Sequence, residues 1–181
     1  MPAERRRTVL LGLAFLALLV VSSVENTVFF NVLGEVLSNQ FLAIGMLFIH
    51  NILVISLILL AMTFYVSLVD SDIFKREKYA HIVLEHPRTF AIVFTIIILF
   101  LSILRGSNLI YGGISVEVLP LILLVSTPIG TVEGYGIYLT IKKTLSREMT
   151  IKGLVFIYAV FLIAAIMEVG FINLLIWVAA G

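Results

Sequence analysis

Two glutamates, Glu133 and Glu168, lie deep inside long hydrophobic runs of the 181-residue chain. The sequence around them reads P-I-G-T-V-E-G (128–134) and A-A-I-M-E-V-G (164–170). A carboxylate within a membrane-spanning segment is costly, so it usually faces a bundle interior or a wet cavity. If the two approach each other, burial and like charge leave at least one of them protonated. Such a pair would serve either as a proton relay or as a shared-proton hydrogen bond between helices.

The segment P-I-G-T-V-E-G-Y-G surrounds Glu133 with residues that disturb helices. Proline removes a helix hydrogen bond and clashes with the preceding turn, and glycine permits conformations closed to other residues. Two interpretations are open: a broken helix that presents Glu133 to a cation or proton, or a kinked helix with close packing and a buried, hydrogen-bonded Glu. The predicted helix break consists of Pro128, Gly130, Gly134 and Gly136.

A further polar pair, His50 and Asn51, interrupts another long apolar run. We expect Asn51 to form a hydrogen bond across helices, with His50 as a partner for a glutamate; a ligand-binding role is the alternative. No metal site is predicted, because His81 and His86 belong to a charged loop. The predicted intramembrane polar core is therefore Glu133, Glu168, Asn51 and His50.

The composition indicates an integral membrane protein. Hydrophobic residues make up 61% of the chain, charged residues only 13%, and the mean hydropathy is +1.18, whereas soluble domains average about 25% charged residues. The net charge of +1 says nothing about nucleic acid, but no basic patch alternates with aromatic residues, so we expect no nucleic-acid partner. The chain has no cysteine, and it contains no familiar catalytic or nucleotide-binding motif. We therefore expect no enzyme activity and no cofactor.

The hydrophobic runs predict an all-α polytopic bundle forming a single transmembrane domain, residues 1–181. A spanning helix needs about 20 apolar residues, and five runs come close to or exceed that length. They cover residues 8–24, 41–69, 89–104, 114–141 and 153–180. The first run follows Arg5, Arg6 and Arg7, and we interpret it as a signal anchor rather than a cleaved signal peptide.

Positive charges predict the orientation, because Lys and Arg of short loops stay on the cytoplasmic side. With five crossings, eleven of the twelve cations fall on one side: those of the N-terminal tail, of loop 70–88 and of loop 142–152. Arg105 alone falls on the other side. The sequence therefore predicts a multi-pass protein of the cell membrane with a cytoplasmic N-terminus and an external C-terminus.

The segment Thr27–Gln40 has apolar residues at the spacing of one helix face and no Lys or Arg. We expect it to form an amphipathic helix along the outer surface or beneath a partner protein.

Three short motifs resemble those of the stage II sporulation protein M family of integral membrane proteins. They are F-I-H-N-I-L-V (48–54), P-I-G-T-V-E (128–133) and A-A-I-M-E (164–168), and their order and the five predicted spans extend the resemblance over nearly the whole chain. The second motif departs from the family pattern, since Ile129 occupies the usual histidine position. The resemblance implies a non-enzymatic membrane scaffold.

The leading functional hypothesis is therefore a scaffold or assembly subunit in the lipid bilayer, associating with itself or with other membrane proteins. The alternative is a channel or transporter that moves a proton or monovalent cation past Glu133 and Glu168. A lipid-handling protein or intramembrane enzyme has less support, because two separated carboxylates, without a nucleophile or a set of metal ligands, are weak evidence for a catalytic site.

Overall fold

The computed structural model describes residues 3–36, 39–71, 81–111 and 119–180, and all its regular elements there are helices. The prediction of an all-α protein is thus confirmed for these residues. The elements are α1 (Ala3–Val36), α2 (Gln40–Asp70), α3 (Ile82–Glu85), α4 (Pro87–Tyr111), α5 (Leu119–Leu145) and α6 (Ile151–Ala180).

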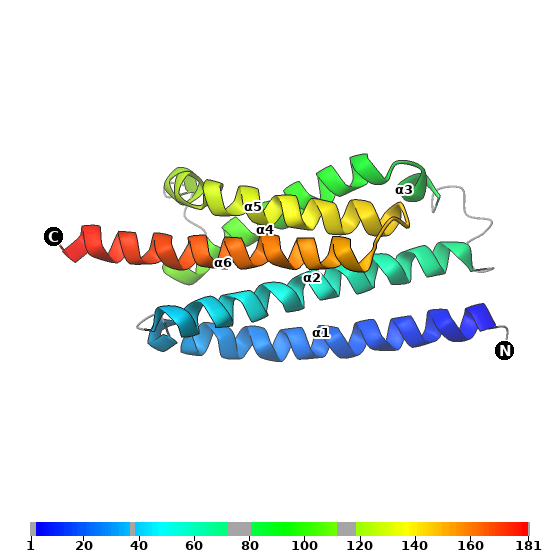
Figure 1. Cartoon of the computed structure of the whole chain (residues 1–181), viewed down its shortest axis with the longest axis horizontal. Helices are drawn as coiled ribbons and strands as arrows, with labels where there is room; N and C mark the ends of the chain where they lie inside the picture. Colours follow the sequence, from blue (N-terminus) through cyan, green and yellow to red (C-terminus); the bar gives the residue numbers. More distant parts are fainter. Residues whose placement is uncertain (1–2, 37–38, 72–80, 112–118, 181) are drawn as a thin grey trace.

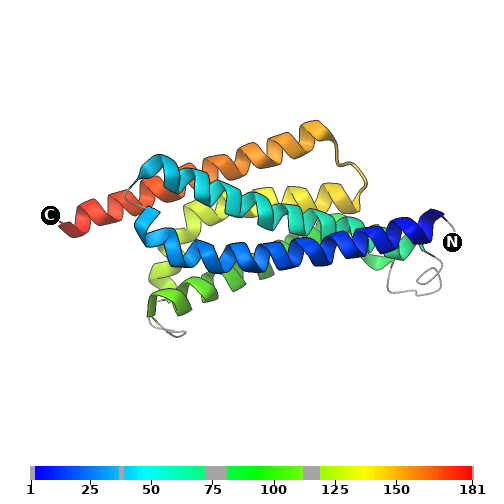
Figure 2. The ribbon, with the colours of Figure 1, turned by 90° about the horizontal axis from the view of Figure 1, so that it is seen from below.

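The five long helices run alternately up and down one elongated bundle, and the two termini lie at opposite ends (Figures 1 and 2). Helix α1 packs mainly against α2. Helix α2 in turn contacts α5 and α6, and α5 lies between α4 and α6. The single turn α3 adjoins the start of α4. Helix α1 is therefore peripheral, and α2 and α5, each in contact with three other long helices, are central.

Local sequence fixes several helix ends. The Oδ1 atom of Asn39 accepts a hydrogen bond from the backbone N–H of Leu42 at 3.2 Å and caps α2. The Oγ1 atom of Thr150 accepts one from the N–H of Gly153 at 3.0 Å and caps α6. Both side chains satisfy donors that the first turn of a helix leaves free. Helix α5 ends at Leu145. Two residues later, Arg147 has a positive φ of 58°, a conformation that commonly follows the end of a helix.

Two clusters of buried apolar side chains hold the bundle together. The larger joins α2, α4, α5 and α6, with Ile55, Ala91, Ile141 and Ile157 all fully buried. The smaller joins α1, α2 and α6 through Phe29, Ala43, Leu47, Ala165 and Val169. Most other apolar side chains of α1, α4 and α6 are exposed, as expected of helices whose outer faces meet lipid.

Three helical segments are long and apolar enough to cross a membrane: Arg5–Phe29, Gln40–Asp70 and Ile151–Leu174, and Pro87–Ile103 is a shorter apolar helix. These apolar helical segments indicate that the chain is a membrane protein. The predicted runs 8–24, 41–69, 89–104, 114–141 and 153–180 fall mainly on α1, α2, α4, α5 and α6, although helices and runs do not end at the same residues. The five crossings and their orientation stay predictions.

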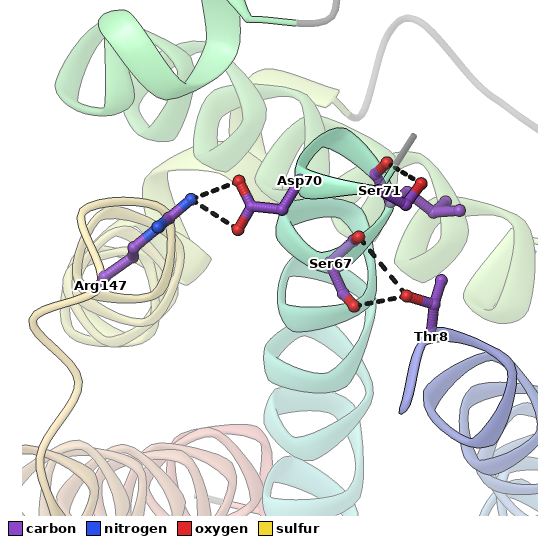
Figure 3. A network of polar contacts seen from close by, with 6 residues as sticks. Thr8, Ser67, Asp70, Ser71 and Arg147 are labelled. Carbon is purple, nitrogen blue, oxygen red and sulfur yellow. Dashed lines mark hydrogen bonds and ion pairs between the residues drawn. The ribbon is translucent and has the colours of Figure 1, made fainter. Parts of the chain in front are cut away.

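The end of the bundle that holds the N-terminus is tied together by polar contacts (Figure 3). The hydroxyls of Thr8 on α1 and Ser67 on α2 lie 2.8 Å apart. The Nη2 atom of Arg147 donates to both carboxylate oxygens of Asp70, at 2.6 and 2.7 Å. This ion pair is exposed to solvent, so it contributes little to stability. It nevertheless joins the end of α2 to the turn between α5 and α6.

One sequence-based expectation about a helix boundary was wrong. Residues 27–36 do not form a separate amphipathic helix, because α1 continues to Val36; residues 37 and 38 lie outside the described part. Helix ends extend into the segments predicted as cytoplasmic loops, 70–88 and 142–152: α4 begins at Pro87, α5 reaches Leu145 and α6 begins at Ile151. The position of these loops relative to the membrane stays a prediction. A helix that leaves the apolar layer can continue in polar sequence, so hydropathy alone misplaces its ends.

Candidate functional site

The predicted break in the fourth span is a bend within one helix. Helix α5 is continuous from Leu119 to Leu145 and contains Pro128. Its first turns, yellow-green in Figure 1, run at a steep angle to the rest of the helix, and Figure 2 shows the same change of direction. A proline within a helix is a common cause of such a bend. Glu133 follows Pro128 five residues later within α5.

Three of the four predicted polar residues come together in the bundle interior. The carboxyl group of Glu133 on α5 interacts electrostatically with that of Glu168 on α6 and lies near the side-chain amide of Asn51 on α2. All three residues are partly buried. They therefore form a small polar cluster where three helices meet, which we call the carboxylate cluster.

The amide of Asn51 is not fully satisfied in this cluster. Its Nδ2 atom is buried and makes no hydrogen bond of standard geometry, although the side chain lies close enough to the Glu133 carboxyl group to act on it as a hydrogen-bonding neighbour. An unpaired buried donor costs roughly 1–3 kcal/mol. The sequence-based expectation of a hydrogen bond from Asn51 across helices stays a prediction, and Glu133 on α5 is a candidate acceptor.

The glycines after Pro128 differ in what surrounds them. A Cβ added at Gly136 would clash with the ring of Phe161 on α6. One at Gly134 would lie 2.8 Å from Cδ1 of Leu99 on α4, whereas one at Gly130 would meet open space. Gly134 and Gly136 do not break α5; they let neighbouring helices approach it closely. This corrects the prediction that they form part of a helix break.

His50 belongs to a different site from Asn51. Its Nδ1 atom lies 2.9 Å from Oε2 of Glu25 on α1, and its ring stacks on Phe29 with centroids 4.4 Å apart. Because an ionised carboxylate only accepts hydrogen bonds, Nδ1–H is the donor in this pair. Glu25 and Phe29 lie one helical turn apart, so α1 holds the imidazole from two sides.

Glu25 was missing from the predicted polar core because it follows the first hydrophobic run directly. Its partner in α2 is 25 residues away, and only the antiparallel packing of α1 on α2 brings them together. The expectation that His50 pairs with a glutamate fits this geometry, although the glutamate is neither Glu133 nor Glu168. No group of three or more metal-ligating side chains occurs among the described residues.

No family model, curated protein or solved structure matches the chain.

Proposed function

We propose that the chain is a non-enzymatic assembly subunit of a membrane, which associates through α1 with a second copy or another membrane protein. The observation that carries this proposal is the position of α1. It packs mainly on α2, and among its described side chains only Thr8 and Phe29 are buried. The resemblance of three motifs to the stage II sporulation protein M family agrees with a scaffold.

In this proposal all five long helices cross the bilayer, with the N-terminus in the cytoplasm. The supporting observation is the placement of the described cations. Arg5, Arg6 and Arg7 begin α1, and Lys142, Lys143, Arg147 and Lys152 surround the turn between α5 and α6, at the same end of the bundle. Positive charge of this kind stays on the cytoplasmic side.

Chemical cross-linking of the chain in native membranes tests the role of α1. Val24 on α1 and Val155 on α6 are matched positions, with 60% and 62% of their surface exposed. Val24→Trp should reduce cross-linked species, because a large side chain disturbs packing on that face, whereas Val155→Trp should not. Equal amounts of cross-linked species in the two variants would contradict the proposal that α1 is the association surface.

A second candidate function is transport of a proton or monovalent cation, and the carboxylate cluster favours it. Two carboxyl groups and an unpaired amide meet beside a bent helix, and ionisable residues inside membrane bundles commonly mark ion pathways. Irregular helices also form ion sites in transporters. In this function Glu133 would bind the proton or cation, and Glu168 would continue the path.

Flux into proteoliposomes distinguishes the two functions. Purified chain would be reconstituted, and proton and monovalent-cation flux measured for the wild type, Glu133→Gln and Glu168→Gln, with folding checked for each. The assembly proposal predicts no flux in any of them. Flux in the wild type that either folded variant loses would establish transport instead.

A further inference from the structure

A groove of about 500 Å³ lies on the surface between α1 and α2, away from the carboxylate cluster. Its volume falls in the range typical of small-molecule sites, roughly 300–1,000 Å³. The residues that line it extend over eight positions on each helix, from 19 to 26 and from 50 to 57. At about 1.5 Å per residue, the groove is about 10 Å long and runs parallel to the helices.

One half of the groove is apolar. Leu19 and Val20 of α1 face it together with Val54 and Leu57 of α2. These residues lie nearer to the middle of both helices than the rest of the lining, because α1 and α2 are antiparallel. This half would accommodate hydrocarbon at a depth where the bilayer itself is hydrocarbon.

The other half is polar and lies toward the end of the bundle remote from the N-terminus. It contains the ion pair of His50 with Glu25 and the hydroxyl of Ser22, whose buried Oγ atom has no hydrogen-bond partner. About a fifth of the side-chain surface is exposed in each member of the ion pair: 17% for His50 and 21% for Glu25. The polar half is thus reachable from outside but not freely solvated.

We propose that this groove binds the upper part of one membrane lipid, with its acyl chain in the apolar half and an ammonium headgroup at Glu25. The inference rests on the order of polarity along the groove, which is that of an amphiphile lying parallel to the helices. It is independent of the proposed function. A lipid can enter such a groove directly from the bilayer, because its acyl chain does not have to pass through water.

The chemistry of the polar half selects a headgroup that donates hydrogen bonds. The carboxylate of Glu25 has about four acceptor positions, and His50 occupies only some of them. None of the described residues that line the groove is Lys or Arg, so a phosphate alone would find no cationic partner. A primary ammonium group therefore suits the site better than a trimethylated one, which has no N–H to donate.

Native mass spectrometry of the full chain measures this binding directly. The chain would be purified with equal amounts of phosphatidylethanolamine and phosphatidylcholine that carry identical acyl chains. We expect the ethanolamine lipid to be retained about tenfold more than the choline lipid, since a hydrogen bond to a charged group discriminates on this scale. Glu25→Gln should remove that preference. Equal retention of the two lipids by the wild type would overturn the proposed headgroup site.

Two neighbouring valines provide a matched pair for the groove itself. Val20 lines the groove and Val21 does not, yet both are more than half exposed. Val20→Trp should lower lipid retention several-fold by filling the apolar half, and Val21→Trp should leave it unchanged. Equal retention in these variants would refute the site. A change in oligomeric mass without a change in lipid retention in Val20→Trp would show that protein covers the groove, which also refutes it.

Discussion

Ionisable side chains occur at two separate places inside the bundle, and they differ in how well they are satisfied. Glu25 and His50 form a direct pair, whereas in the carboxylate cluster the Nδ2 atom of Asn51 makes no hydrogen bond of standard geometry. The first arrangement stabilises the packing of α1 on α2. The second brings two carboxyl groups and a poorly satisfied amide together in the interior, and ionisable residues inside membrane bundles commonly mark functional sites.

The Glu25–His50 pair should stabilise the packing of α1 against α2. Removing either side chain leaves the other without its partner, so Glu25→Ala and His50→Ala should each lower the free energy of unfolding. We expect a coupling energy of about 1 kcal/mol in a double-mutant cycle, since interhelical hydrogen bonds in membrane proteins average about 0.6 and reach about 1.7 kcal/mol. Denaturant titration of the four proteins in detergent measures it, and purely additive effects would contradict the pair.

A third carboxylate in the carboxylate cluster should be costly. Asn51→Asp would place another negative charge beside Glu133 and Glu168, and we expect it to lower the free energy of unfolding by at least about 1 kcal/mol near neutral pH. The loss should shrink at acidic pH, where the carboxylates take up protons. Glu133→Gln is the control and should be less destabilising than Asn51→Asp, because it adds no charge to the cluster. Thermal unfolding across pH tests both; wild-type stability of Asn51→Asp at neutral pH would contradict the cluster.

Which of these residues could be predicted from sequence depends on their surroundings in the chain. Glu133 and Glu168 are conspicuous because apolar residues flank them on both sides. Glu25 is not, because it lies at the edge of its run, and its role depends on the register of α1 against α2. Periodicity does not specify that register.

At the scale of elements, α5 combines a bend with close packing. Helix α5 contains Pro128, and two glycines beyond it, Gly134 and Gly136, allow α4 and α6 to approach. The sequence indicated an irregular helix but did not distinguish a break from a bend. Hydrogen bonds from Thr131 to the carbonyl of Thr127, at 2.7 Å, and from Thr140 to that of Gly136, at 2.8 Å, supplement the helix on either side of Glu133.

The glycines of α5 offer a matched test of packing. Gly136→Ala should destabilise the protein by about 1–3 kcal/mol, because the new methyl group forces Phe161 to move within a packed core. Gly130→Ala meets open space and should be neutral or stabilising by up to about 1 kcal/mol. Unfolding free energies of the two variants provide the comparison. Equal effects would mean that Gly136 does not lie against α6.

Hydrophobic runs predicted which segments are helical better than where the helices end. The run 8–24 corresponds to a helix of 34 residues, Ala3–Val36. The run covers only the apolar part of that helix. Helix ends depend on local hydrogen bonds instead, such as those at the Asn39 cap of α2 and at the turn that contains Arg147.

At the scale of the molecule, five antiparallel helices place the termini at opposite ends and the described basic residues mostly at one end. Because the chain has no cysteine, single cysteines can report its orientation without further changes. Gln40→Cys and Glu148→Cys introduce thiols at exposed positions on opposite ends of the bundle. An impermeant maleimide should label Gln40→Cys in intact cells and Glu148→Cys only after permeabilisation. The reverse pattern would invert the topology, and labelling of both in intact cells would exclude an odd number of crossings between them.

The most direct test of the assembly proposal is the mass of the chain extracted from native membranes in polymer-bounded lipid discs. The single chain has a mass of 20.1 kDa. We predict complexes that contain at least two copies or a stoichiometric second membrane protein, and we expect Val24→Trp to reduce them. A homogeneous population of single chains, with no partner at stoichiometric amounts, would contradict the proposal that this protein acts by assembly.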